Sequence, residues 1–159
     1  MAKVSVEGLD EFISQLAKLG GEVNKINRGA LGEAAGYVAE QISNALDSMP
    51  VRDEGRSDHR LFGATASEKE QIINNFGISK FRSSGGTTDT SIGFTGYVET
   101  QSPKFGNQVP TGMLMQCINY GTEFRQGTHT IDNALRVNKN TISEIIQGYI
   151  DDKVNEIIS

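Results

Sequence analysis

The chain has very few of the residues that build disulfides and metal centres: one cysteine and two histidines among 159 residues. With Cys117 alone, an internal disulfide and a zinc ribbon of the CxxC type are both excluded. No apolar run approaches the roughly 20 residues with which a helix spans a bilayer. The first residues also lack the apolar core and cleavage site of a secretion signal, so we expect the product to act in the cytoplasm, where it is made.

An excess of basic charge is missing too. The sequence has 15 basic and 20 acidic residues and a net charge of -5. Because phosphate contacts need clustered Lys and Arg, this balance argues against a dedicated nucleic-acid binder. The length fits a single domain over residues 1–159, which would bury roughly 68 to 70% of its unfolded surface. The composition therefore favours a structural or binding role over catalysis.

The first third of the chain predicts two helices. Val4 and Val6 alternate with polar residues and predict a short strand over 3–7, which Gly8 ends. Apolar residues at helical spacing predict a helix over 9–19, with Gly20-Gly21 as its stop. A second, long helix is predicted over 24–48, ending before Pro50.

Small residues form a stripe on the long helix. Each helical glycine costs roughly 0.5 to 1 kcal/mol relative to alanine, so a close contact should compensate. The contact is expected with another helix of the domain or, less commonly, with a neighbouring subunit. The stripe consists of Gly29, Gly32, Gly36 and Ser43.

Residues 50–63 have mixed charge and predict an exposed loop. After it, Ser67 and Glu70 have the spacing of a capping box, which predicts a short helix ending at Asn74 or Asn75. From Gly77 to Gly127 the sequence is rich in glycine, serine and threonine, as is typical of strands joined by turns.

A β-hairpin is predicted in this glycine-rich region. Its strands are expected over 78–82 and 90–94, joined through Ser83–Thr88, where Gly85-Gly86 supplies positive φ. Tyr97-Val98-Glu99 predicts a further strand, and 101–110 predicts a loop that presents Lys104 and Phe105.

The last third predicts two more helices. The short apolar run over 111–119 favours a helix, and Tyr120-Gly121-Thr122 ends it. A final helix is predicted from about 132 to the C-terminus, about 37 Å long, so that it crosses the whole domain. The predicted fold class is α+β: a small antiparallel sheet with a β-hairpin, packed against two long helices with shorter helices beside them.

No arrangement of residues indicates catalysis, a cofactor or a metal. Cys117 lies in an apolar run, where an inert buried thiol is far commoner than a nucleophile paired with His59 or His129. A serine triad through Asp58 and His59 has no nucleophile-elbow motif to support it. A metal site within 53–59 would match no known ligand spacing. His129 is expected in the turn before the last helix.

Three phrases, in this order, resemble the tail-completion and neck family of long-tailed bacteriophages. Val6-Glu7-Gly8-Leu9-Asp10-Glu11-Phe12 is similar to its opening strand and first helix, which a long Ala-rich helix follows. Residues 76–82 and 90–94, with the Ser/Gly turn between them, are similar to its central hairpin. Ile118-Asn119-Tyr120-Gly121-Thr122 resembles its phrase of an aromatic residue, glycine and threonine. The chain departs from the family at Asn119, where glutamate is usual, and in 126–134, which lacks the usual proline-rich phrase.

The resemblance implies a non-enzymatic subunit without a cofactor, in a ring at the junction between head and tail of a virion. Six copies are expected, with a total charge of roughly -30, so that an acidic lumen would repel the DNA that passes through it. The implied partners are further copies, a head-completion or connector protein, and a tail-tube or terminator protein. The resemblance implies no specific binding of DNA and no membrane partner.

Exposed segments that could reach neighbours are candidate interfaces. They are the charged loop, the hairpin tip, the loop over 101–110 and the aromatic-Gly-Thr phrase. The residues are Arg52, Arg56, Arg60, Ser84, Gly85, Gly86, Lys104, Phe105, Tyr120, Gly121 and Thr122.

Three other functions remain open. A tail terminator, which stops polymerisation of the tail tube, belongs to the same structural class. A small phage-encoded enzyme or toxin is supported only by Cys117 and the two histidines. A DNA-binding regulator would show salt-sensitive affinity for DNA.

Overall fold

The computed structural model describes residues 9–52, 61–84 and 87–159. The strand predicted over 3–7 and most of the predicted charged loop lie outside these residues. The helices are α1 (Leu9–Asp47), α2 (Ala66–Asn74), α3 (Thr111–Tyr120) and α4 (Thr130–Ile158). The strands are β1 (Leu61–Phe62), β2 (Phe76–Ile78), β3 (Arg82–Ser84), β4 (Thr87–Asp89), β5 (Ile92–Phe94), β6 (Tyr97–Ser102), β7 (Gly106–Pro110), β8 (Gly121–Thr122) and β9 (Arg125–Gln126).

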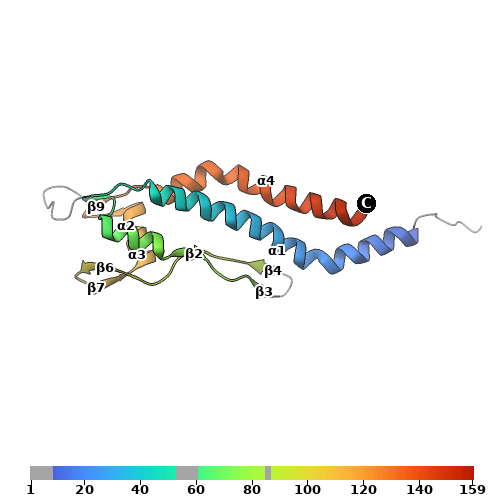
Figure 1. Cartoon of the computed structure of the whole chain (residues 1–159), viewed down its shortest axis with the longest axis horizontal. Helices are drawn as coiled ribbons and strands as arrows, with labels where there is room; N and C mark the ends of the chain where they lie inside the picture. The colour runs from blue at the N-terminus through green and yellow to red at the C-terminus, as the bar shows by residue number, and fades with distance from the viewer. Residues whose placement is uncertain (1–8, 53–60, 85–86) are drawn as a thin grey trace, which may run out of the picture.

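The predicted α+β class is confirmed, with two long helices and small antiparallel sheets. Helices α1 and α4 lie side by side, and the short helices with most of the strands gather at one end of this pair (Figure 1). The 39 residues of α1 span about 58 Å, whereas a compact chain of this length has a radius of gyration of about 15 Å. The helix pair therefore extends well beyond the globular part.

The stop predicted at Gly20-Gly21 is wrong, because α1 is continuous through both glycines. Neither has the positive φ with which glycine ends a helix, and a Cβ at either position would contact nothing. Continuing the helix keeps its hydrogen bonds, at a cost of about 1 kcal/mol per glycine. The predicted end before Pro50 is confirmed, and Lys69 Nζ donates there to the carbonyl oxygens of Asp47 and Met49, at 2.5 and 3.1 Å.

The small-residue stripe of α1 lies partly against α4. At Gly29 a Cβ would collide with the hydroxyl of Tyr149, and its distance to Tyr149 Cε1 would be 2.7 Å. Gly32 instead faces the Phe81 ring of the hairpin, 3.6 Å away. The crossing predicted within the domain is thus confirmed at Gly29, where only a glycine lets the tyrosine ring approach.

The hydrophobic core lies where the C-terminal end of α1 meets α2, α3 and the β6–β7 hairpin. We call this part of the molecule the body. Leu46, Ile72, Val98 and Ile118 are fully buried there. The whole buried cluster is Ile42, Leu46, Met49, Ala64, Ile72, Val98, Val109, Leu114, Met115 and Ile118.

The capping box of α2 is formed by Thr65 and Glu68, two residues before the predicted pair of Ser67 and Glu70. Thr65 Oγ1 accepts from the Glu68 amide at 3.2 Å, and Glu68 Oε2 accepts from the Thr65 amide at 3.0 Å. Glu68 is only 3% exposed, and its other oxygen accepts from Thr100 Oγ1 at 2.7 Å. These tertiary contacts, which sequence spacing does not contain, select the earlier box.

The predicted hairpin is confirmed, but not its strand bounds: 76–78 pairs with 92–94 and 82–84 with 87–89, in place of one pair of strands over 78–82 and 90–94. Strand β2 pairs with β5 antiparallel, and β3 pairs with β4. Between these two paired parts, the Ser79 hydroxyl accepts a hydrogen bond from the Ser91 amide at 2.9 Å, which links the two sides of the hairpin. The hairpin runs beside α1, as the Phe81 contact also indicates (Figure 1).

The loop predicted over 101–110 is wrong, because its first two residues end strand β6 and its last five form β7, the two strands of another hairpin. Strands β6 and β7 pair antiparallel, with Val98 opposite Val109 and both buried. Strand β7 has few apolar residues, so its period of two is not visible in the sequence. The two-residue strands β8 and β9, with β1 parallel to β9, also gave no periodic signal.

The predicted helices of the last third are confirmed as α3 and α4. Helix α4 begins at Thr130, two residues before the predicted start, and His129 precedes it in a left-handed conformation with φ 53°.

The Gly29 contact gives a first prediction. Gly29→Val should lower the free energy of unfolding by about 1 to 3 kcal/mol, because the added carbons meet the Tyr149 ring. Gly36→Ala is the matched control: no atom lies within 4 Å of its Cβ, so it should stabilise the helix by up to about 1 kcal/mol. Urea unfolding followed by circular dichroism measures both. A Gly29→Val chain as stable as wild type would contradict the packing described.

Candidate functional site

The aromatic-Gly-Thr phrase occupies a sharp reversal of the chain between α3 and the β8–β9 hairpin. Gly121 follows α3 with φ 85°, a conformation that other residues rarely adopt. A Cβ there would lie 2.7 Å from the Gly127 nitrogen and 2.8 Å from the Arg125 carbonyl oxygen. Thr122 pairs with Arg125 in the hairpin, and its Oγ1 accepts from the Phe124 amide at 3.3 Å. The phrase therefore makes a tight turn that only glycine permits.

Tyr120 lies at the surface beside the start of α4, and the residue is 62% exposed. Its hydroxyl donates to Asp132 Oδ1 at 3.0 Å. This hydrogen bond, together with the negative charge of Asp132, raises the pKa of Tyr120. The other carboxylate oxygen of Asp132 lies 3.9 Å from Nδ1 of His129. An aromatic, a carboxylate and an imidazole thus form one exposed polar group.

Asn119 is buried and holds the start of α4. Its Oδ1 accepts from the Ile131 amide at 2.9 Å, and its backbone oxygen accepts from the His129 amide at 2.9 Å. The first amides of a helix have no partner within it, so the side-chain oxygen of Asn119 supplies an acceptor that α4 itself lacks.

An exposed phenylalanine at the tip of the β8–β9 hairpin was not predicted. The Phe124 carbonyl accepts from the Leu61 amide at 3.0 Å, whereas its ring is 73% exposed. Phe62 of the neighbouring strand β1 is also exposed. Aromatic residues are enriched among those that dominate binding energy at interfaces. The only signal in the sequence was an aromatic residue between Glu123 and Arg125, directly after the aromatic-Gly-Thr phrase.

Arg52, the first predicted interface arginine, is half-buried within the subunit. Its Nη2 lies 3.6 Å from Glu68 Oε2. Arg125 interacts electrostatically with the same buried carboxylate. Burial lowers the pKa of Arg125, and the negative charge of Glu68 opposes that shift. Arg125 Nη1 also donates to the Gly63 carbonyl oxygen at 2.5 Å. Arg52 therefore connects the end of α1 to α2. Arg56 and Arg60 lie outside the described residues.

The other predicted interface residues are at two places. Lys104 is exposed at the turn of the β6–β7 hairpin, with Nζ 5.3 Å from the centroid of the Phe105 ring, which packs against the core. This turn, Arg52 and the Tyr120–Thr122 turn all belong to the body. Ser84 is exposed at the far end of β3, away from the body (Figure 1). Gly85 and Gly86 lie outside the described residues.

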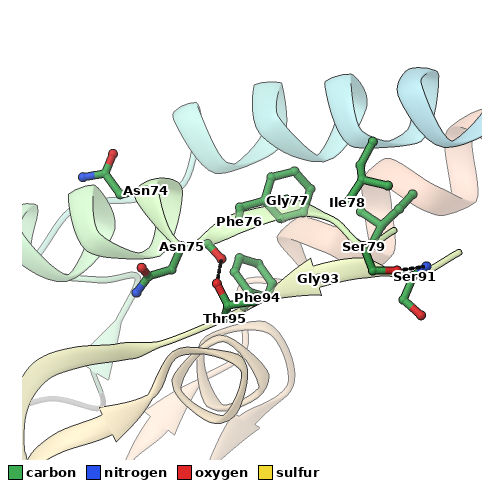
Figure 2. A pocket seen from close by; sticks show the side chains of 11 residues that line it. Asn74, Asn75, Phe76, Gly77, Ile78, Ser79, Ser91, Gly93, Phe94 and Thr95 are labelled. Atoms are coloured by element: carbon green, nitrogen blue, oxygen red, sulfur yellow. Dashed lines mark hydrogen bonds between the residues drawn. The ribbon is translucent and has the colours of Figure 1, made fainter. Parts of the chain in front are cut away.

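A groove of about 330 Å³ lies along strands β2 and β5. Figure 2 shows the rings of Phe76 and Phe94 beneath it, with centroids 5.3 Å apart, and the bond between Ser79 and Ser91 at one side. None of the described residues that line it has an ionisable side chain. The groove can hold an apolar group, but its lining offers no general acid, base or metal ligand.

The described residues contain no group of three His, Cys, Asp or Glu side chains placed to hold a metal ion. Over the same residues, no helix is long and apolar enough to span a membrane. Cys117 is a free, half-buried thiol of α3. Of the histidines that could have served it, His129 contacts Asp132, and His59 lies outside the described residues.

No protein-family model, curated protein or solved structure matches this chain.

The hydrogen bond of Tyr120 gives a second prediction. Asp132→Asn should lower the pKa of Tyr120 toward its usual value. The negative charge that disfavours the tyrosinate is removed, and the hydrogen bond to a charged acceptor is lost with it. Tyrosinate absorbance in an alkaline titration measures the shift. In a Tyr120→Phe background, Asp132→Asn should leave the remaining titration unchanged, and a difference there would contradict the assignment.

Proposed function

We propose that the chain is a structural subunit of the neck of a long-tailed phage. As part of a ring of six copies, it completes the tail and joins it to the DNA-filled head. Its partners are neighbouring copies, a head-completion or connector protein, and a tail-tube or terminator protein. Assembly takes place in the host cytoplasm, and DNA passes through the lumen without specific binding.

The observation that carries this proposal is the large uncovered surface of the long helices. None of the 29 residues of α4 is fully buried, although the helix has many isoleucines. A helix with a broad apolar face ordinarily buries that face against protein. In this chain the packing of α1 on α4 leaves Leu135, Val137 and Ile158 exposed. A subunit of an assembly, which is completed by its neighbours, accounts for this surface better than a free-standing protein does.

The places of the resembling phrases support the same proposal. Residues 76–82 and 90–94 lie in the hairpin beside α1, and Tyr120-Gly121-Thr122 joins α3 to the exposed tip at Phe124. These two phrases thus belong to elements that reach the surface, whereas the first phrase lies partly outside the described residues. The body ends in an exposed aromatic residue, and such residues are frequent anchors in protein interfaces.

An enzymatic role has less support. The groove along β2 and β5 has no ionisable lining residue, and Cys117 lies in a helix beside core residues. The acidic net charge of the chain favours neither DNA binding nor a gripping contact with DNA in a lumen.

Deletion of the reading frame from its phage or prophage tests the proposal, with negative-stain electron microscopy of the lysate. Full heads beside detached tails of normal length are expected. Overlong tails would indicate a tail terminator instead. Intact, infectious virions would overturn the neck proposal and leave the enzyme and regulator hypotheses to be tested by Cys117→Ala and by DNA binding at low salt.

Complementation of the deletion gives a third prediction. Phe124→Ser should remove about 2 kcal/mol from the contact that the ring makes, or about 30-fold in affinity, so heads and tails should separate. Phe124→Tyr, which keeps the ring, should restore virions. Circular dichroism of both purified chains verifies folding, since the side chain is exposed. Normal titres with Phe124→Ser would mean that Phe124 is not at a joining interface.

A further inference from the structure

Strand β5 has an outer edge, on the side away from β2, that no described strand covers. Within the described residues β5 pairs with β2 alone. The Ser91 carbonyl and the Thr95 amide are bonded across this pair, at 2.7 and 2.8 Å. In an antiparallel pair bonded positions alternate with positions whose N–H and C=O groups point away from the partner strand. Ile92 and Phe94 therefore direct their backbone groups along the outer edge of β5.

A cleft of about 280 Å³ lies along this edge. It is lined by all three residues of β5 and by α3, but by no described residue of β2, so it lies on the outer side of β5. Met115 and Ile131 give its far wall an apolar lining, and Tyr120, one of the predicted interface residues, lines it too. Among the described residues, no acidic or basic side chain lines the cleft, and the outward backbone groups of Ile92 and Phe94 have no hydrogen-bond partner.

The two faces of β5 differ, and this difference decides which occupant fits. Ile92 and Phe94 lie on one face and pack against the core, whereas Gly93 lies on the other face, where nothing is within 4 Å of a Cβ. A strand added to the outer edge continues both faces. Its residues beside Ile92 and Phe94 meet apolar surface, and the residues between them meet solvent. Main-chain hydrogen bonds give such an addition affinity, and alternate side chains give it specificity.

The segment predicted as a strand over 3–7 has the pattern that this edge requires. Val4 and Val6 have the same spacing as Ile92 and Phe94, and the residues beside and between them are polar. The segment lies outside the described residues. A single strand is not stable in water and needs a sheet edge to pair with.

Residues 3–7 cannot reach β5 of their own copy. Helix α1 begins at Leu9, at the end of the long helices away from the body (Figure 1). Along α1, Leu9 lies about 34 Å from Gly32, which faces the Phe81 ring, and β5 pairs with β2 still closer to the body. The six residues from Lys3 to Leu9 extend over at most about 20 Å. The segment can therefore meet this edge only in another copy of the chain.

We propose that residues 3–7 of one copy add as a strand to the outer edge of β5 in a neighbouring copy, with Val4 and Val6 in the cleft beside α3. The contact joins different surfaces of the two copies, so it is heterologous and can repeat around a ring. The inference rests on the proposed function in that both require copies to associate in a ring. It adds the segment and the edge that meet.

Sedimentation equilibrium of the full chain tests the segment. The wild type should associate in a concentration-dependent manner, and Val4→Lys with Val6→Lys should weaken association by about 30-fold or more, because two apolar side chains leave the cleft. Ser5→Lys with Glu7→Gln is the matched control. It adds the same charge on the alternate face of the strand, so it should associate as wild type does. Circular dichroism must show both variants equally helical.

A variant of the cleft tests the other side of the contact. Gln116 is exposed and lines the cleft, so Gln116→Trp should fill it and weaken association by a similar factor. Met113→Trp is the matched control, because Met113 is exposed on the same helix but does not line the cleft. It should associate as wild type does.

A mixture of the two defective chains tests whether the contact is heterologous. The Val4→Lys, Val6→Lys chain keeps its cleft, and the Gln116→Trp chain keeps its segment. Each alone should stay monomeric at concentrations where the wild type associates. Mixed, they should form pairs of one copy each and nothing larger, because one intact segment meets one intact cleft.

The outcomes separate this inference from the neck proposal. A wild type that stays monomeric, or a mixture that does not pair, would overturn the strand addition. If Gln116→Trp weakens association but the Val4 and Val6 changes do not, another segment occupies the cleft and the inference fails. If the mixture pairs but deletion of the reading frame leaves normal virions, the strand addition stands and the neck proposal fails.

Discussion

The antiparallel packing of α4 on α1 is the contact on which the shape of this protein depends. Helix α1 is much longer than the body, so beyond the core it has only α4 and the hairpin to lie against. Gly29 lets the Tyr149 ring approach the α1 backbone, and the Tyr37–Asn138 and Gln15–Ile158 bonds fix the register on either side. Because two helices can cover only one side of each other, the same contact leaves Leu16, Val23 and Ile158 exposed.

Buried polar side chains hold the candidate surfaces to the body. Glu68 caps α2, accepts from Thr100 of β6 and pairs with Arg52, so one carboxylate links three segments. Asn119 does the same between α3 and α4. A buried acceptor without partners costs about 1 to 3 kcal/mol, so these bonds specify where the segments lie. The exposed Tyr120 and Phe124 take their places from this buried network.

The long helices could be predicted from periodicity, because apolar side chains recur at helical spacing in α1 and α4, whereas α3 was predicted from a short apolar run and the hairpin from its turn residues. The candidate site was less predictable. The turn at Tyr120-Gly121-Thr122 was identified, but Arg52 turned out to pair inside the subunit, because its partner Glu68 is distant in sequence. Phe105 packs against the core, while Phe124, in a two-residue turn without periodicity, is the exposed ring. Local sequence does not say which aromatic residue a distant segment covers.

The sequence by itself determined the α+β class, the hairpin, the glycine turn after α3 and the helix end before Pro50, since each depends on nearby residues. Only the tertiary structure decided that Gly20-Gly21 continue a helix, that Thr65 rather than Ser67 caps α2, and that β7 is a strand. In each of these cases the local sequence is compatible with two conformations. Contacts between residues far apart in the chain, such as Glu68 with Thr100 and Val98 with Val109, favour one of them.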